Sequence, residues 1–373
     1  MSQKTGSSIV TDGLALYYDM GTSKSYRGKP TVNLVPTPDT MAGFSNYWYG
    51  PAVAKYFPDL GYSGFTLVNA GSWNGVVKTV TIPSAGTYTF SAWLRYHGGS
   101  ANNNGGQVYI NNWRGGGDDT AVGINKALVG IWQRVSITLA CTTLSPNMYI
   151  ISYGGTDGID YSSWDIAMPQ VEAGSVATPF VIASRTTVSA IVDLLSVNTI
   201  TAQSITYDSE SAFSFNGSSD YLEITGTSIG SFSGDFAIDG WMRRTAATGT
   251  LFELGLYTDG ILFRPWGSDD LYINGSNYGN ITQYIPINTW CHFTLTRLGS
   301  STILYINGVQ VWSATISTTI NSSAANTKIG MSRHSAGQYY TGSVSQFRIY
   351  KNKGLSALEA KQNFNAHRGR FGV

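Results

Sequence analysis

The sequence predicts an all-β protein made of two antiparallel jelly-roll β-sandwiches, with one short helix near the C-terminus. Only 12% of the residues are charged, against about 25% in average soluble proteins. The chain is rich in Tyr (23 residues) and Gly (43 residues), types that favour strands and turns respectively. Apolar and polar residues alternate along most of the chain, between clusters of Gly, Asn, Ser and Pro. At 373 residues the chain exceeds one typical domain, so two domains are expected.

Strands are predicted most clearly at residues 87–95, 132–139 and 303–312, where the alternation is regular. In the last of these, Asn307-Gly308 separates two alternating runs and predicts a tight hairpin, because a type I′ turn needs positive φ at both central positions. The helix is predicted at residues 357–364. Ser356 would cap it and Glu359 would complete a capping box.

Three segments of the first half have counterparts in the second half, in the same order. Residues 87–95 parallel 235–243, residues 129–138 parallel 287–296, and residues 163–171 parallel 342–350. Each pair shares its pattern of aromatic and apolar positions, although the spacings differ. Two related sandwiches are therefore expected.

The second half resembles the laminin-G-like, concanavalin A-like domains of bacteriophage virion proteins. The segments that carry the resemblance are residues 213–224, 236–241, 288–290, 304–308 and 342–360. The tail at 362–372 is also similar to the ends of tailed-phage structural proteins. The resemblance implies a concanavalin A-like sandwich from about residue 205 to the end.

The opening residues 9–20 and 24–28 resemble the first strand of the same domain, which resumes only near Ile191. Between them, residues 31–38 look like the start of a carbohydrate-binding-module-like jelly roll, and residues 169–180 look like its end. These resemblances imply an inserted domain at 30–183, within a sandwich formed by 7–29 plus 184–373. The hypothesis requires residues 9–20 to pair with the C-terminal sheet.

Several function classes are disfavoured by composition. The formal net charge of +1 gives no attraction to nucleic acid or to an anionic membrane, so neither is an expected partner. No apolar run approaches about 20 residues, so membrane insertion is not expected. The N-terminus lacks the apolar core of a secretory signal. Cys141 and Cys291 are predicted to be buried free thiols.

No catalytic centre is recognisable, and the chain is expected not to be an enzyme. Glycosidases need two carboxylates across a cleft, whereas Glu172, Glu223 and Glu253 stand singly in the sequence. Cys291 and His292 are adjacent, so on a strand they would face opposite ways, as a core Cys beside a rim His. A polysaccharide depolymerase with a site assembled from distant residues stays open as an alternative.

Calcium is the one candidate cofactor, because laminin-G-like domains sometimes bind it through loop acids and carbonyls. Calcium takes six to eight oxygen ligands, and no EF-hand pattern is present. Acidic pairs in turns are more often solvated turn formers. The candidate ligands are Asp118, Asp119, Asp269, Asp270 and Asp220.

Glycan binding is the activity that the loops favour, since sugars are bound by exposed aromatic faces with amide and carboxylate groups nearby. The candidates are Trp113, Trp266, Trp48, Asn111 and Asp269. Trp113 and Trp266 are expected to be exposed, because Gly, Asn and Asp surround them. The tryptophans within alternating runs are instead expected in the core: Trp93, Trp132, Trp241 and Trp290.

The resemblance implies a structural protein on the virion surface, as a capsid decoration or a tail or fibre component, with weak glycan binding for host attachment. Its expected partners are other virion proteins, a host-surface glycan and further copies of itself, since many weak sites on one particle give avidity. The alternative is a dedicated glycan-binding receptor adhesin of the tail.

Overall fold

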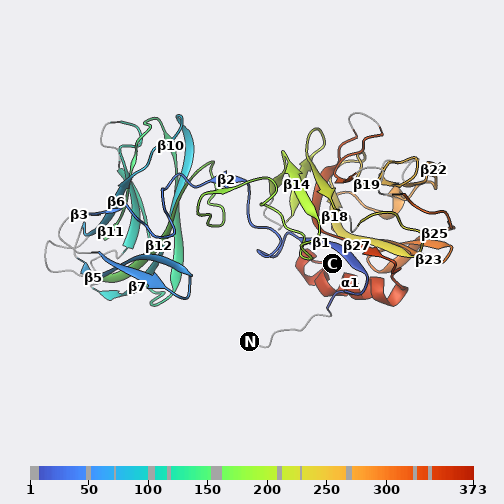
Figure 1. Ribbon diagram of the computed structural model, residues 1–373, viewed down its shortest axis with the longest axis horizontal. Helices are drawn as coiled ribbons and strands as arrows, with labels where there is room; N and C mark the ends of the chain where they lie inside the picture. Colours follow the sequence, from blue (N-terminus) through green and yellow to red (C-terminus); the bar gives the residue numbers. More distant parts are fainter. Residues whose placement is uncertain are drawn as a thin grey trace. The chain divides into compact units, whose positions relative to one another are not determined.

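The computed structural model describes residues 8–47, 52–70, 73–99, 106–115, 119–152, 162–207, 212–226, 229–265, 271–321, 326–334 and 338–373. The chain forms two compact units (Figure 1). Unit 1 comprises Met1–Lys29 with Thr186–Val373, and unit 2 comprises Pro30–Arg185. The second junction therefore lies two residues beyond the one expected from the sequence. The predicted all-β class is confirmed, with a single α-helix near the C-terminus of the described chain.

Unit 1 is a sandwich of two antiparallel sheets. The first sheet has the order β15 (Thr206–Tyr207), β16 (Phe213–Asn216), β27 (Thr341–Lys351), β18 (Phe236–Arg244), β23 (Cys291–Leu298), β24 (Ser301–Ile306) and β25 (Val309–Thr315), with β1 (Leu14–Asp19) also paired to β27. The second has the order β14 (Thr199–Gln203), β17 (Tyr221–Thr225), β26 (Thr327–Ile329), β19 (Phe252–Leu254), β20 (Ile261–Phe263), β21 (Leu271–Ile273) and β22 (Ser276–Asn277). A 3₁₀ turn, η1 (Thr282–Tyr284), precedes β23. One apolar core fills the space between the two sheets.

Two strands from distant parts of the sequence share one edge of β27. β16 pairs with its first half, from Phe213 opposite Val344 to Asn216 opposite Thr341. β1 pairs with its second half, from Asp19 opposite Gln346 to Leu14 opposite Tyr350. The N-terminal strand thus completes a sheet whose other strands all come from the second half of the chain.

Helix α1 (Ala357–Phe371) packs on the outer face of the eight-stranded sheet, on the side opposite β14, β19 and β22 (Figure 1). The predicted capping box is confirmed. The Ser356 hydroxyl accepts the Glu359 N–H, and the Glu359 carboxylate accepts the Ser356 N–H. The helix continues seven residues beyond its predicted end and stops at Gly372, whose φ of 69° is left-handed.

Trp241 is the centre of the contact between α1 and the sheet. Its ring stacks on Phe371 at 4.2 Å and on Phe364 at 5.7 Å. Trp290 joins the same small apolar cluster. Burial of Trp241 and Trp290 agrees with their predicted place in the core.

A buried polar layer lies beside this aromatic cluster, under α1. Asp239 on β18 accepts hydrogen bonds from the Arg348 guanidinium, from the Thr294 hydroxyl at 2.8 Å and from the Asn363 amide at 3.3 Å. The His292 Nε2 atom lies 3.1 Å from the same carboxylate. All five residues are fully buried. Strand alternation does place Cys291 and His292 on opposite faces, but the expected rim position of His292 is wrong, because α1 covers that face.

The Asn307-Gly308 hairpin is confirmed between β24 and β25. Both residues have positive φ, 51° and 76°. Both cysteines are buried free thiols, as expected, and burial raises the pKa of each to about 11.

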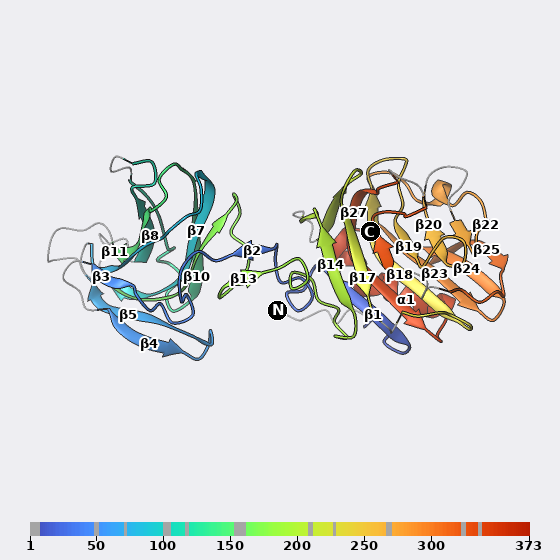
Figure 2. The same cartoon turned by 45° about the horizontal axis from the view of Figure 1, so that its top comes forward.

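Unit 2 is a second two-sheet sandwich (Figure 2). One sheet has the order β10 (Trp132–Cys141), β7 (Gly86–Gly99), β12 (Ser162–Ala173), β5 (Tyr62–Ala70) and β4 (Val53–Phe57). The other has the order β3 (Ser45–Tyr47), β6 (Gly75–Thr79), β11 (Asn147–Ser152), β8 (Gly106–Asn111) and β9 (Asp119–Gly123). The chain enters and leaves unit 2 side by side, because β2 (Thr31–Val32) pairs with β13 (Ser184–Arg185). Adjacent ends allow a folded unit to interrupt a host chain.

Within the described residues, no helix is both long and apolar enough to cross a membrane.

Candidate functional site

Most of the predicted loop candidates lie outside the described residues. These are Trp48, Asp118, Trp266, Asp269 and Asp270. Asp119 begins β9 and Asn111 ends β8, where the two residues are partners in the sheet register. Their proposed part in ligand binding stays a prediction.

Trp113 is buried, with 7% of its surface exposed, so the expectation of an exposed ring is wrong. Its backbone carbonyl accepts the N–H groups of Thr142 and Thr143, which tie the turn after β8 to the end of β10. The ring thereby closes the apolar core of unit 2, and the Arg114 guanidinium covers it at 3.9 Å. The polar residues next to Trp113 in the sequence did not indicate its contact with Thr142 and Thr143.

Trp93 and Trp132 are only half-buried, contrary to the core position expected for them. On β7 the core is filled by the residues at even positions, from Tyr88 to Tyr96, so Trp93 faces outward. The Trp132 indole N–H donates to Asp59 at 2.8 Å on the same outer face. The predicted alternation is correct, but the two tryptophans expected to face the core lie on the outer face.

Asp220, one of the calcium candidates, is buried within its own turn. It is 2% exposed, and its carboxylate accepts the Asn216 N–H and the Ser219 hydroxyl, each at 3.0 Å, inside its own turn. No cluster of three or more His, Cys, Asp or Glu with metal-binding geometry occurs in the part of the chain that the structure describes. Calcium at Asp220 and at the other acids stays a prediction.

The seven-stranded sheet of unit 1 carries a cross-strand row of polar residues on the face opposite its core. Glu223 on β17 lies opposite Lys328 on β26, and Lys328 lies opposite Glu253 on β19. The register continues through Leu262 on β20, which is apolar and fully buried, to Tyr272 on β21. The residues before and after each of these positions are buried, and all of them except Thr327 belong to the apolar core, so strand alternation places the row on the outer face. Arg333 contacts both glutamates. We call the four residues Glu223, Lys328, Glu253 and Arg333 the charged row.

Two cations hold the carboxylates of the charged row in place. Lys328 Nζ lies 3.6 Å from Glu223, and burial lowers the pKa of this lysine despite the nearby carboxylate. Arg333 bridges Glu223 at 3.8 Å and Glu253 at 3.9 Å. The backbone N–H of Arg333 also donates to Glu253 at 2.5 Å. Glu253 is 1% exposed, whereas the Glu223 side chain keeps 28% of its surface, so Glu223 is the carboxylate that a ligand can reach.

Aromatic side chains flank the charged row at both ends. Tyr221 lies under the Lys328 amine, 4.0 Å from ring centre to nitrogen. On the other side His334 lies against Tyr257 with ring centres 3.6 Å apart, and Tyr257 meets the edge of Tyr272 at 6.1 Å. The three tyrosines are half-buried and His334 is exposed. The outer face therefore combines accessible rings with a carboxylate, an amine and, at Asn326, an amide that donates to Glu223 at 3.3 Å.

The sequence did not indicate this grouping. Glu223 and Glu253 were expected to stand apart, whereas the β17–β26–β19 register separates them by a single strand. Thirty residues divide them along the chain, and β26, which joins them, comes more than 70 residues later. Only the alternation at residues 221–225, with polar residues at every second position, could have indicated an exposed strand face there.

One family model matches a part of the second half of the chain. Residues 216–361 match the family model described as the concanavalin A-like lectin/glucanases superfamily. The matched range lies wholly within unit 1, spans less than half of the chain and includes the charged row. No curated protein matches the chain.

Similar solved structures have low identity. Domain 4 of AbnA, a GH43 extracellular arabinanase from Geobacillus stearothermophilus, in complex with arabinotriose, is 19% identical over 46% of this chain and 91% of that one, with a TM-score of 0.36. The binding domain of Paraclostridial Mosquitocidal Protein 1 is 18% identical over 48% of this chain and 49% of that one, with a TM-score of 0.37. The receptor binding domain of botulinum neurotoxin D is 13% identical over 49% of this chain and 51% of that one, with a TM-score of 0.39.

The chain spans about half the length of the two toxin domains that it matches. With TM-scores below 0.5, these likenesses carry no inference about function. The sandwich architecture and the family match together define unit 1: it has a concanavalin A-like fold, and residues 216–361 within it match the concanavalin A-like lectin/glucanases superfamily.

Proposed function

We propose that this chain is a glycan-binding protein displayed on a phage particle, and that it binds sugars through the outer face of the seven-stranded sheet. The observation that carries the glycan part is the combination of the charged row with the accessible rings of Tyr257, Tyr272 and His334. The virion setting is supported by the sequence resemblance alone.

The face has the chemical groups that sugar recognition needs. Aromatic rings cover the apolar C–H face of a sugar, while fixed polar groups exchange hydrogen bonds with its hydroxyls. Glu223 accepts and Asn326 donates, both on the exposed side of the ion pairs. Because the cations already orient Glu223, little side-chain entropy is lost when a ligand binds.

We propose binding without catalysis. A glycosidase uses one carboxylic acid as proton donor to the leaving group and a second carboxylate opposite it. Here Arg333 contacts both glutamates, and Glu253 is enclosed beneath it. The pair is thus arranged as two ion-paired carboxylates on one side of a ligand, not as an acid and a base across a cleft.

A site on a sheet face suits weak binding by many copies. A single site of this kind gains avidity when it is repeated on one assembly. We therefore propose that the protein is part of a homo-oligomer or of a multi-copy array with other virion proteins, at the virion surface, where a host-surface glycan is its ligand.

The test is binding to a glycan array and to host polysaccharide by the full chain, presented in many copies. Tyr272→Ala removes a ring of the face and Glu223→Gln removes the accessible charge. Tyr56→Ala is the matched control, because Tyr56 is 58% exposed on β4 of unit 2. We expect saturable binding to fall at least about tenfold in the first two variants, equivalent to about 1.4 kcal/mol, and not in the control.

Equal binding by all four proteins would exclude this face as the site. A released sugar product on incubation with the parent protein, lost in Glu223→Gln, would instead favour the depolymerase alternative.

A further inference from the structure

The sheet of unit 2 that contains β7 carries a half-exposed tryptophan on the face opposite its core. Trp93 on β7 lies opposite Arg134 on β10 and Ala167 on β12. Its ring has no ring or cation contact, and its indole N–H has no hydrogen bond, to any residue that the structure describes. Tryptophan is enriched at binding interfaces, where its ring and its N–H both find partners. Trp93 therefore offers a ring and a donor to a ligand.

The residues next to Trp93 make this face both aromatic and polar. Arg95, two residues further along β7, lies opposite Trp132 on β10 and Asp165 on β12. His97 follows after another two residues, and strand alternation places Trp93, Arg95 and His97 on one face. We call the five residues Trp93, Arg95, His97, Trp132 and Asp165 the tryptophan face.

Asp165 fixes the polar side chains of the tryptophan face. Its buried carboxylate accepts from Arg95 Nε at 3.0 Å, from Arg95 Nη2 at 2.8 Å and from the Thr66 hydroxyl at 2.5 Å. His97 Nε2 lies 2.7 Å from the same carboxylate. Burial alone would raise the pKa of Asp165, but the hydrogen bonds from Thr66, His97 and Arg95 outweigh it and lower the pKa. Arg95 and His97 are thus oriented before a ligand binds, which reduces the side-chain entropy lost on binding.

The turn between β4 and β5 adds a carboxylate that a ligand can reach. Asp59 accepts from Arg95 Nη1 at 2.7 Å and from the Trp132 indole N–H at 2.8 Å. The Arg95 guanidinium lies 4.5 Å from the Trp132 ring centre, and Phe57 packs edge-to-face with that ring at 5.1 Å. The side chains of Asp59 and His97 keep 49% and 38% of their surface exposed. A ligand on this face therefore meets a carboxylate and an imidazole that are already held in place.

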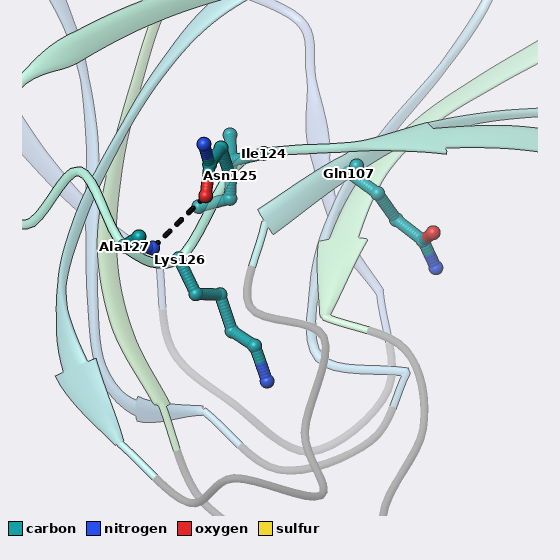
Figure 3. Close-up of a pocket in the computed structure, with 6 residues that line it drawn as sticks. Gln107, Ile124, Asn125, Lys126 and Ala127 are labelled. Carbon is teal, nitrogen blue, oxygen red and sulfur yellow. Dashed lines mark hydrogen bonds between the residues drawn. The ribbon is translucent and has the colours of Figure 1, made fainter.

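The loop that leads into Trp132 is held by its own hydrogen bonds. The Asn125 side-chain oxygen accepts the Ala127 N–H at 3.0 Å, the contact marked in Figure 3. The Gln133 amide exchanges two hydrogen bonds with the Asn125 backbone, at 2.8 and 3.0 Å. The pocket of about 510 Å³ in the same figure shares no residue with the tryptophan face. These contacts fix the start of β10 and, with it, the position of Trp132.

The charges on this face leave no net attraction for an ion. Among the described residues of the five strands and of the β4–β5 turn, the charged side chains on this face are three basic and three acidic ones: Arg95, Arg134, Lys55, Asp59, Asp165 and Glu172. The balance favours an uncharged ligand, and the hydroxyl groups of a sugar can both donate and accept hydrogen bonds.

We propose that the tryptophan face is a second ligand site, and that it binds an uncharged oligosaccharide lying along β7. One sugar ring packs its C–H face on Trp93, and hydroxyl groups of the following sugar residues bond to Asp59 and His97. At about 3.3 Å per residue, Trp93 and His97 are about 13 Å apart along the strand, so the ligand has more than one sugar unit. The inference shares its class of ligand with the proposed function but not its site, since the charged row lies in unit 1.

The test measures binding of the full chain to an array of uncharged oligosaccharides, with Tyr272→Ala present in every protein to disable the face proposed in unit 1. Trp93→Ala removes the ring and His97→Ala removes a polar group. Tyr56→Ala is the matched control, because Tyr56 is 58% exposed on β4 and points away from the face that Phe57 shares with Trp132. We expect the Tyr272→Ala protein to bind saturably. Adding Trp93→Ala should weaken binding at least about tenfold and His97→Ala about threefold, whereas the control should not change it.

Three results would overturn the inference. The first is no saturable binding by the Tyr272→Ala protein, which would leave the face in unit 1 as the site. The second is binding that neither Trp93→Ala nor His97→Ala weakens; if Trp93→Ala lowers the unfolding midpoint, His97→Ala decides. The third is tighter binding of tetragalacturonate than of uncharged galactotetraose.

Sedimentation of the same proteins tests the other occupant of this face, a second copy of the chain. An oligomer that Trp93→Ala dissociates, without any sugar binding, would assign the tryptophan face to contact between copies and would also overturn the inference. Binding that survives Tyr272→Ala and is lost on adding Trp93→Ala supports this site, whatever the outcome for the proposed function.

Discussion

Replacing Asp239 with asparagine removes the only negative charge from the described part of the polar layer formed by Asp239, Arg348, His292, Thr294 and Asn363. The carboxylate accepts from Arg348 and from the hydroxyl and amide groups beside it, and every partner is fully buried. Breaking a buried ion pair on one side costs about 3–5 kcal/mol, because the remaining charge stays buried without compensation. We expect the Asp239→Asn variant to lose that much unfolding free energy in unit 1.

The expected shift of the unfolding temperature follows from the size of the unit. Unit 1 has roughly 220 residues, and a domain of this size shifts by about 2–4 °C for each kcal/mol. The variant should therefore unfold about 6–20 °C below the parent. Because two units unfold in one chain, hydrogen exchange followed by mass spectrometry should be used to assign the transition to β18, β23 and β27.

The pH dependence gives an independent check. Burial alone would raise the pKa of Asp239, but the Arg348 and His292 charges outweigh it and hold the pKa well below its ordinary value. A carboxyl whose pKa is lower in the folded than in the unfolded chain stabilises the fold at every pH above its unfolded pKa, which is near 4. This stability is lost as the pH falls further. The Asp239→Asn variant should lose this part of the acid dependence.

Two results would refute the reasoning. One is a loss below about 1 kcal/mol in Asp239→Asn, as expected for a surface pair. The other is a double variant, Asp239→Leu with Arg348→Met, whose loss of unfolding free energy equals the sum of the losses in the two single variants. Removing both charges should cost less than removing one. Asp12→Asn, at an exposed carboxylate, is the control and should change stability little.

Four further outcomes are expected. Trp113→Ala should destabilise unit 2 by about 3–5 kcal/mol in urea, because it empties a buried ring position; a change below 1 kcal/mol would contradict the burial. Ser356→Ala should cost about 0.5–2 kcal/mol by removing the cap of α1, and an unchanged midpoint would exclude the capping box as a stabilising element. A thiol reagent should label Cys141 and Cys291 only in denaturant, because both are buried and the pKa of each is raised to about 11; rapid native labelling would contradict this. Burial lowers the pKa of His367 to about 4, so stability should fall as the pH drops from about 6.5 through 4, and His367→Gln should flatten that slope in acid-titration melts.

The sequence predicted the parts of the fold that are decided locally. The Asn307-Gly308 turn requires positive φ, and the Ser356–Glu359 box satisfies the first N–H groups of a helix, so both could be placed from short segments. The extension of α1 to Phe371 was missed, because its last turns are held by the contact of Phe371 with Trp241 rather than by their own composition.

The candidate site depended on contacts that short segments do not encode. Trp113 looked exposed from its polar neighbours, but the strand end at Thr142 and Thr143 closes over it. Glu223 and Glu253 looked isolated, and only the strand order of the sheet makes them neighbours of one lysine. Neither the burial of Trp113 nor the proximity of Glu223 to Glu253 follows from their positions in the sequence.

The pairing of β1 with β27 has a consequence for how the protein is made. More than 320 residues separate the two strands, so at about 5–20 residues per second the ribosome needs on the order of 15–65 seconds after β1 before its partner emerges. During that interval unit 2 can fold completely, since its own ends pair with each other through β2 and β13. The first strand of unit 1 meanwhile waits as an apolar segment with unpaired backbone groups. Folding of unit 1 should therefore wait for the synthesis of β27, and slower synthesis should prolong the time that β1 remains unpaired.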